Sequence, residues 1–263
     1  MKRLPNATLK PTPITRTRHR LPGNRGRRPL LQCCFVVVAL AAHGLLVAEL
    51  KGSEPPAISG PLFQEATNEF AAMTTTSYQH KTQVDSAAGR YDYDCAGFIS
   101  YALKRAAPQA WATTVNITGI ARGRIPSPLQ YRAFFASLTE KPQLGWEAVT
   151  KAADLRPGDV VAWEHKTESA VGHAVVIDGA PVPLPDGSWL VEVYDSTSSP
   201  HSDDSRSEDH RAQVLASTGR RSGLGHGVMV FMADPVSGAL TGVRWSPKAK
   251  AITVPIAAGR PTS

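Results

Sequence analysis

The sequence predicts an α+β domain in which helices come first and an antiparallel sheet follows. Two observations support this prediction. In the first half of the chain, between residues 61 and 138, apolar side chains recur at helical spacing in three segments. From about residue 155 they fall instead into short apolar runs that are separated by turn residues, which is typical of strands. No internal repeat interrupts this order.

The helical segments each present one apolar face. The second segment begins at Asp94, which is a good N-cap residue, and its apolar side chains form one stripe along residues 98–106. We expect Pro108 to end this helix, and residues 130–138 predict a shorter one. The apolar face of the first segment consists of Leu62, Phe63, Ala66, Phe70 and Met73.

Turn residues bound the apolar runs of the second half. Pro157-Gly158-Asp159 precedes the first run, and Pro185-Asp186-Gly187 precedes the third. The predicted strands are 160–163, 173–177, 189–194, 227–232 and 241–245. Between the third and fourth strands lies a long polar segment, 196–226, which we interpret as a loop of the kind that often forms a lid.

The positive net charge of +7 is located at the N-terminus. Residues 1–48 hold nine of the 29 Lys and Arg and no acidic residue, which leaves 20 basic against 22 acidic side chains in the remainder. A nucleic-acid-binding domain needs its cations on the folded part. The charge distribution therefore predicts no nucleic-acid partner.

The N-terminal region has the organisation of an export segment. A basic leader, 1–28, which we expect to be disordered, precedes an apolar stretch within 29–48. This stretch is either a signal peptide or a membrane anchor, and both place the rest of the chain outside the cytoplasm. Residues 49–60 follow as a linker, and 61–263 form the domain, with an expected core at about 78–246.

Cysteine usage singles out one thiol. Cys33 and Cys34 belong to the apolar leader, so the exported domain keeps only Cys95. A secreted domain that uses cysteine for stability needs pairs, so a lone cysteine indicates a reactive thiol or an intermolecular disulfide. Cys95 follows the N-cap of a predicted helix, where the helix dipole and the free N–H groups stabilise a thiolate.

A thiolate nucleophile also needs a histidine base and a third polar group that orients the histidine. His173 opens a predicted strand, and Asp195 follows the next one, so neighbouring antiparallel strands can bring them together. His165, at the end of the preceding strand, is the alternative base. The hypothesis is a triad of Cys95, His173 and Asp195.

These segments resemble the NlpC-type cell-wall peptidase family. Asp94-Cys95-Ala96-Gly97-Phe98 is similar to the family's nucleophile motif. Residues 155–163, with their Pro-Gly-Asp turn, and 172–177, with their Gly-His start, are similar to its histidine block. The similarity covers roughly residues 78–195, with both blocks in the family's order.

The resemblance implies a papain-like core and hydrolysis of amide bonds in cell-wall peptides, without metal or cofactor. It assigns Cys95 as nucleophile, His173 as base and Asp195 as the orienting residue. It also makes Asp94, the acid before the nucleophile, a candidate ligand for a substrate amine, with Tyr93 as a second substrate-binding candidate. We expect a monomer that contacts a membrane only through its N-terminal segment.

The chain departs from the family pattern in two places, and two alternatives stay open. Ala96 replaces the usual serine, and the segment after Asp195 is long and polar. A thiol acyltransferase of the same fold, or a non-catalytic cell-envelope binding protein, is the alternative function. The following acidic and histidine residues match no zinc or calcium spacing, so we interpret them as part of a solvated loop: His201, Asp203, Asp204, Asp209 and His210.

Overall fold

The computed structural model describes residues 60–121, 123–165 and 172–262. The expected leader, the signal or anchor segment and nearly all of the expected linker lie outside these ranges. None of the helices that the structure describes is long and apolar enough to cross a membrane.

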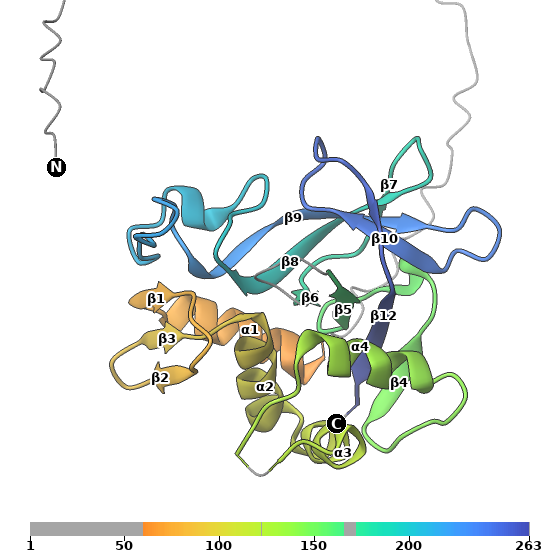
Figure 1. Cartoon of the computed structure of the whole chain (residues 1–263), viewed down its shortest axis with the longest axis horizontal. Coiled ribbons are helices and arrows are strands. Elements are labelled where there is room, and N and C mark those ends of the chain that lie inside the picture. The colour runs from red at the N-terminus through yellow and green to blue at the C-terminus, as the bar shows by residue number, and fades with distance from the viewer. Residues whose placement is uncertain (1–59, 122, 166–171, 263) are drawn as a thin grey trace, which may run out of the picture. The chain divides into compact units, whose positions relative to one another are not determined.

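The large sheet is antiparallel throughout, as the sequence predicts. Its strands follow the order β11-β10-β9-β8-β6-β5-β12-β4, and β7 pairs with β8 (Figure 1). The strands are β4 (Trp146–Val149), β5 (Val160–Glu164), β6 (Gly172–Ile177), β7 (Val182–Pro183), β8 (Trp189–Thr197), β9 (Gly223–Ala233), β10 (Leu240–Arg244), β11 (Ile252–Thr253) and β12 (Ile256–Pro261).

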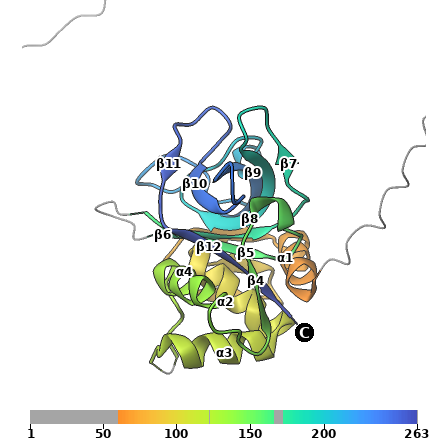
Figure 2. The ribbon, with the colours of Figure 1, turned by 90° about the vertical axis from the view of Figure 1, so that its right-hand side faces the viewer.

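Helices precede the sheet in sequence, which confirms a mixed α+β fold. They are α1 (Pro61–Ala72), α2 (Cys95–Ala106), α3 (Pro108–Thr118) and α4 (Pro128–Ser137). In Figure 2 these helices lie on one side of β5, β6 and β12. The helix α2 ends just before Pro108, as expected, and Pro108 also begins α3, where its fixed φ and missing N–H suit the first turn.

Both faces of the central strands are buried. Alternate residues of β5 and β6, such as Val160 and Val176, pack against the helices. The intervening ones, such as Val161 and Val175, join a second cluster that includes Phe231 on β9. Burial on both faces explains why these strands read as continuous apolar runs.

Three regions differ from the expectation. Residues 74–89, where the sequence predicts no strand, contain β1 (Thr75–Ser77) and β2 (Gln83–Asp85), which form a small sheet with β3 (Arg90–Asp92). The expected core limits of 78 and 246 are too narrow, because α1 packs in the core and β12 lies between β5 and β4. The segment between β8 and β9 is no solvated loop, since several of its polar side chains are buried.

Glu69 on α1 is a buried acid, and among the described residues its carboxyl group accepts a hydrogen bond only from the hydroxyl of Tyr93, at 2.7 Å. Burial raises the pKa of Glu69 from 4.5 to about 8, although this hydrogen bond opposes the change. At pH values between 4.5 and about 8, the carboxyl group of Glu69 is protonated in the folded chain but ionised in the unfolded chain. The free energy of unfolding therefore falls as the pH rises through this window.

We expect Glu69→Gln to remove most of this pH dependence, because glutamine still accepts from Tyr93 but does not titrate. The free energy of unfolding of the variant, relative to that of the wild type, should therefore rise by on the order of 3–5 kcal/mol between pH 5 and pH 8. Urea unfolding at both pH values measures the difference. Glu140→Gln, at an exposed position, is the control. An unchanged pH slope in Glu69→Gln would show that this carboxyl is ionised in the folded chain.

Candidate active site

Cys95 is the first residue of α2. The carboxylate of Asp94 accepts the N–H of Gly97 at 2.8 Å, and this cap fixes the start of the helix. Gly97 allows the helix start to pack closely, because a β-carbon there would meet Thr82 and Tyr93. Cys95 is a free cysteine, 4 % exposed, and it lines an open pocket.

His173 lies on β6 opposite Trp163 of β5. Gly172 permits this pairing, because a β-carbon there would collide with the backbone oxygen of Trp163. The imidazole ring packs edge-on against two indole rings, those of Trp163 and Trp245, each with its centroid 5.2 Å away. The neighbouring strand and the two indoles therefore restrict the orientation of the ring.

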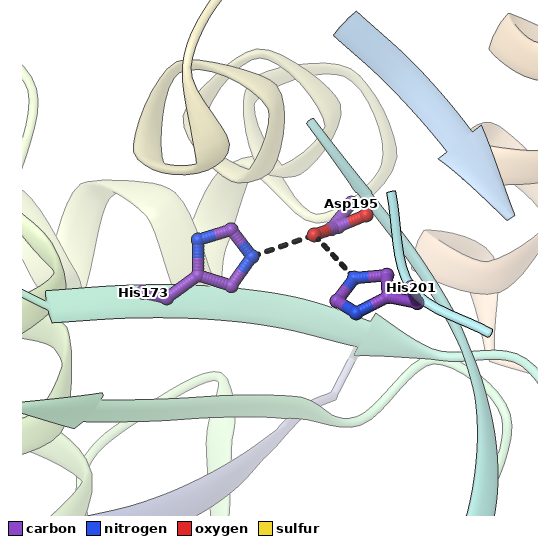
Figure 3. A group of neighbouring side chains, drawn as sticks. All are labelled: His173, Asp195 and His201. Carbon is purple, nitrogen blue, oxygen red and sulfur yellow. Dashed lines mark hydrogen bonds and ion pairs between the residues drawn. The ribbon is translucent and has the colours of Figure 1, made fainter. Parts of the chain in front are cut away.

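Asp195 of β8 holds one nitrogen of this ring. Its Oδ2 lies 2.6 Å from Nε2 of His173, and the other ring nitrogen, Nδ1, points away from Asp195 (Figure 3). Burial lowers the pKa of His173. The charge of Cys95 and hydrogen bonds with Asp195 and Cys95 outweigh burial and raise this pKa to about 9. The imidazolium form therefore dominates at neutral pH.

The three residues singled out from their order in the sequence thus meet at one place. Cys95 comes from the start of α2, His173 from β6 and Asp195 from the adjacent strand β8. It is His173, and not the alternative His165, that pairs with Asp195.

Asp195 is itself fixed by two further groups. His201 Nε2 lies 2.9 Å from the same Oδ2 (Figure 3), and Arg206 donates to Oδ1 at 2.8 Å and to the backbone oxygen at 3.0 Å. Burial would raise the pKa of Asp195, but the charges of Arg206 and His201 and the hydrogen bond with His173 hold it well below its usual range. Asp195 is therefore an ionised carboxylate although it is 0 % exposed.

His201 completes the network from the other side. Its Nδ1 lies 3.2 Å from the backbone oxygen of Trp245, and its ring centroid lies 4.0 Å from that of the indole, with the two planes tilted by 37°. Both ring nitrogens thus face acceptors, a carbonyl and a carboxylate.

His201, Asp204 and Arg206 are the site residues that sequence reasoning missed. We expected His201 and Asp204 in a solvated loop, and this was wrong: both are 8 % exposed and Arg206 is 1 % exposed. The physical reason is the charge of Asp195, which requires nearby cations when buried. One signal was available, because Arg206 is the first Lys or Arg after Asp195 in the chain.

The same three side chains, His173, Asp195 and His201, offer atoms of the kinds that bind metals, all within 4.8 Å of one another. Their spacing decides between a metal site and a hydrogen-bonded network. Ligands placed tetrahedrally around zinc lie roughly 3.3 Å apart for the usual bond lengths. Separations of 2.6 and 2.9 Å are hydrogen-bond lengths, so the arrangement fits a hydrogen-bonded network better than a metal site.

The pocket beside Cys95 includes one of the two expected substrate-binding residues. Asp94 lines it, and the second oxygen of its carboxylate lies 3.2 Å from Nδ1 of His80. Tyr93 does not line it: its side chain is fully buried and its hydroxyl donates to Glu69, so the expected role of Tyr93 in substrate binding was wrong. The tyrosine at this pocket is Tyr78.

The fold and the site together define an α+β protein with a buried Cys-His-Asp arrangement beside an open pocket. In comparisons with known proteins, no family model, no curated protein and no solved structure matches the chain.

Proposed function

We propose that this chain is an exported cysteine hydrolase that cleaves amide bonds in the peptides of a cell wall, as an NlpC-type peptidase does. The observation that carries the proposal is the arrangement around His173. One nitrogen is held by Asp195, the negative charge of Cys95 raises the pKa of the ring, and Cys95 opens on a pocket. A thiol, a base and an orienting acid in this order are the requirements of nucleophilic catalysis.

A papain-like core belongs to the same proposal. The helix that bears the thiol, α2, contacts β6 and β8, which carry the histidine and the acid. The sequence motifs around Cys95 and His173 support it as well. Export rests on the basic and apolar N-terminal segment, which lies outside the described residues.

The proposed reaction uses the charged pair of Cys95 and His173. The sulfur attacks the carbonyl carbon of the scissile amide, and the N–H of Cys95, a first-turn group without an intrahelical partner, stabilises the oxyanion. His173 gives its Nδ1 proton to the leaving amine, and a thioester remains. His173 then takes a proton from water, whose oxygen attacks the thioester. The acid leaves, and the thiolate of Cys95 and the imidazolium of His173 are restored. Asp195 keeps the Nε2–H in place and stabilises the imidazolium throughout.

Mass spectrometry of purified cell-wall fragments, incubated with the full chain, tests this proposal. Hydrolysis appears as fragments whose masses together exceed the parent by one water. Transfer to an amine, the alternative reaction, appears as a product that carries the amine. Fragments that bind the protein but keep their mass would contradict the proposal in favour of a non-catalytic envelope protein.

A further inference from the structure

A second pocket continues from the nucleophile along α2. Four residues of this helix line it, at spacings of three, one and three positions, and therefore share one face: Gly97, Ser100, Tyr101 and Lys104. This pocket and the one that Cys95 lines have His80 and Ile125 in common. A substrate bound at Cys95 can thus extend over this face of the helix.

Three cations from separate segments converge on the second pocket. Lys104 comes from α2, Lys81 from the stretch before β2, and Arg124 from the connection between α3 and α4. No aspartate or glutamate is among the described residues that line it. The ammonium of Lys104 lies 4.6 Å from the centre of the Trp111 ring, a contact that leaves its charge uncompensated.

This concentration of charge stands out against the rest of the domain. After residue 48 the chain has slightly more acidic than basic residues. Six arginines of the described part are paired with carboxylates: Arg105, Arg132, Arg206, Arg211, Arg244 and Arg260. Within the described ranges no salt bridge involves Lys81, Lys104 or Arg124. A recess lined by one sign of charge raises the local concentration of ligands of the opposite sign.

We propose that this pocket binds a carboxylate of the substrate, at a position one to four residues from the scissile bond. The α-helical rise places Gly97 about 3 Å and Lys104 about 13.5 Å along the axis from Cys95. An extended peptide covers this span with about one to four residues, at 3.3–3.6 Å each. Lysine and arginine are the natural partners of a carboxylate, through charge-assisted hydrogen bonds. The inference rests on the proposed function, because it assumes that the substrate reacts at Cys95.

Maleimides with a charged or a neutral tail test the subsite without a known substrate. The thiolate of Cys95 adds to the maleimide double bond, and a proton from water completes the adduct. The probes are maleimidopropionic acid, maleimidocaproic acid and the carboxamide of each, applied to the full chain. Peptide mapping by mass spectrometry then separates labelling of Cys95 from labelling of Cys33 and Cys34.

We expect a caproic acid tail to accelerate labelling of Cys95 about tenfold over its carboxamide. The triple variant Lys81→Gln, Lys104→Gln, Arg124→Gln should lose this advantage, so that its ratio of acid to carboxamide rates falls to about one. The control is the double variant Lys248→Gln, Lys250→Gln, which removes exposed lysines outside the lining of both pockets.

The outcomes separate the subsite from the proposed function. If the carboxamide labels Cys95 but the triple variant keeps the same ratio of acid to amide rates as the control, the subsite is overturned and the reactive thiol stands. If neither reagent labels Cys95 in the folded chain, the thiol is inaccessible, and the subsite and the proposed function both fall.

Discussion

Replacing Cys95 by alanine should abolish the cleavage of cell-wall fragments, with a loss of turnover of about 10⁴-fold or more. The reason is that no other described residue at the pocket offers a thiol to form the covalent intermediate. The loss should fall on kcat, and the fold should be retained, because a single sulfur at the start of α2 is removed. Turnover by mass spectrometry, together with the thermal unfolding curve, measures both effects.

Ala96→Ser provides the matched control at the next position of the same helix. Ala96 also lines the pocket, and serine is the residue that the resembling family carries there. This variant should keep its turnover within a few fold of the wild type. Cleavage that persists in Cys95→Ala would mean that the nucleophile lies elsewhere.

Asp195→Asn should damage both stability and catalysis. One carboxylate oxygen of Asp195 serves His173 and His201, and the other serves Arg206. The asparagine amide has a single acceptor oxygen, so its NH₂ group faces donors that the carboxylate accepted. The loss of the negative charge also leaves the charge of Arg206 less compensated. Breaking one partner of a buried ion pair costs about 3–5 kcal/mol.

The catalytic part of this prediction follows from the orienting role. With asparagine the Nε2–H loses its carboxylate, so kcat should fall by roughly 10- to 10³-fold while KM changes little. Asp209→Asn is the control, because Asp209 also pairs with an arginine, Arg211, but in a partly exposed position where such pairs contribute little. Urea unfolding and steady-state kinetics measure both variants. A stable Asp195→Asn protein with normal kcat would remove Asp195 from the catalytic account.

Local sequence signals predicted the residues that meet at the site. An N-cap before an apolar stripe located Cys95 at the start of α2, and a turn-bounded apolar run located His173 on β6. Asp195 followed from its place at the end of the next predicted run. Such signals depend on neighbours in the chain, which is why they can be read without the structure.

The parts that could not be predicted depend on contacts between distant segments. The strand β12 has small residues where α4 packs on it: a β-carbon at Gly259 would collide with the ring of Phe135. Small residues fit beneath bulky aromatic rings, but they do not form the run of bulky apolar residues that predicts a strand. For this reason β12 was not predicted. Likewise, Arg206 and His201 look like residues of a polar loop until the buried charge of Asp195 is seen beside them.

The central claim is that Cys95 and His173 act as one charged pair, and alkylation of Cys95 by iodoacetamide tests it most directly. Rates for the full-length wild type and His173→Ala are followed on the Cys95 peptide by mass spectrometry. The imidazolium stabilises the thiolate, so at pH 7 the wild type should react at least about tenfold faster than the variant. The gap should narrow as the pH rises past about 8.5, the ordinary pKa of a cysteine thiol, because the variant then forms the thiolate without the imidazolium. Equal rates at pH 7 would contradict the account.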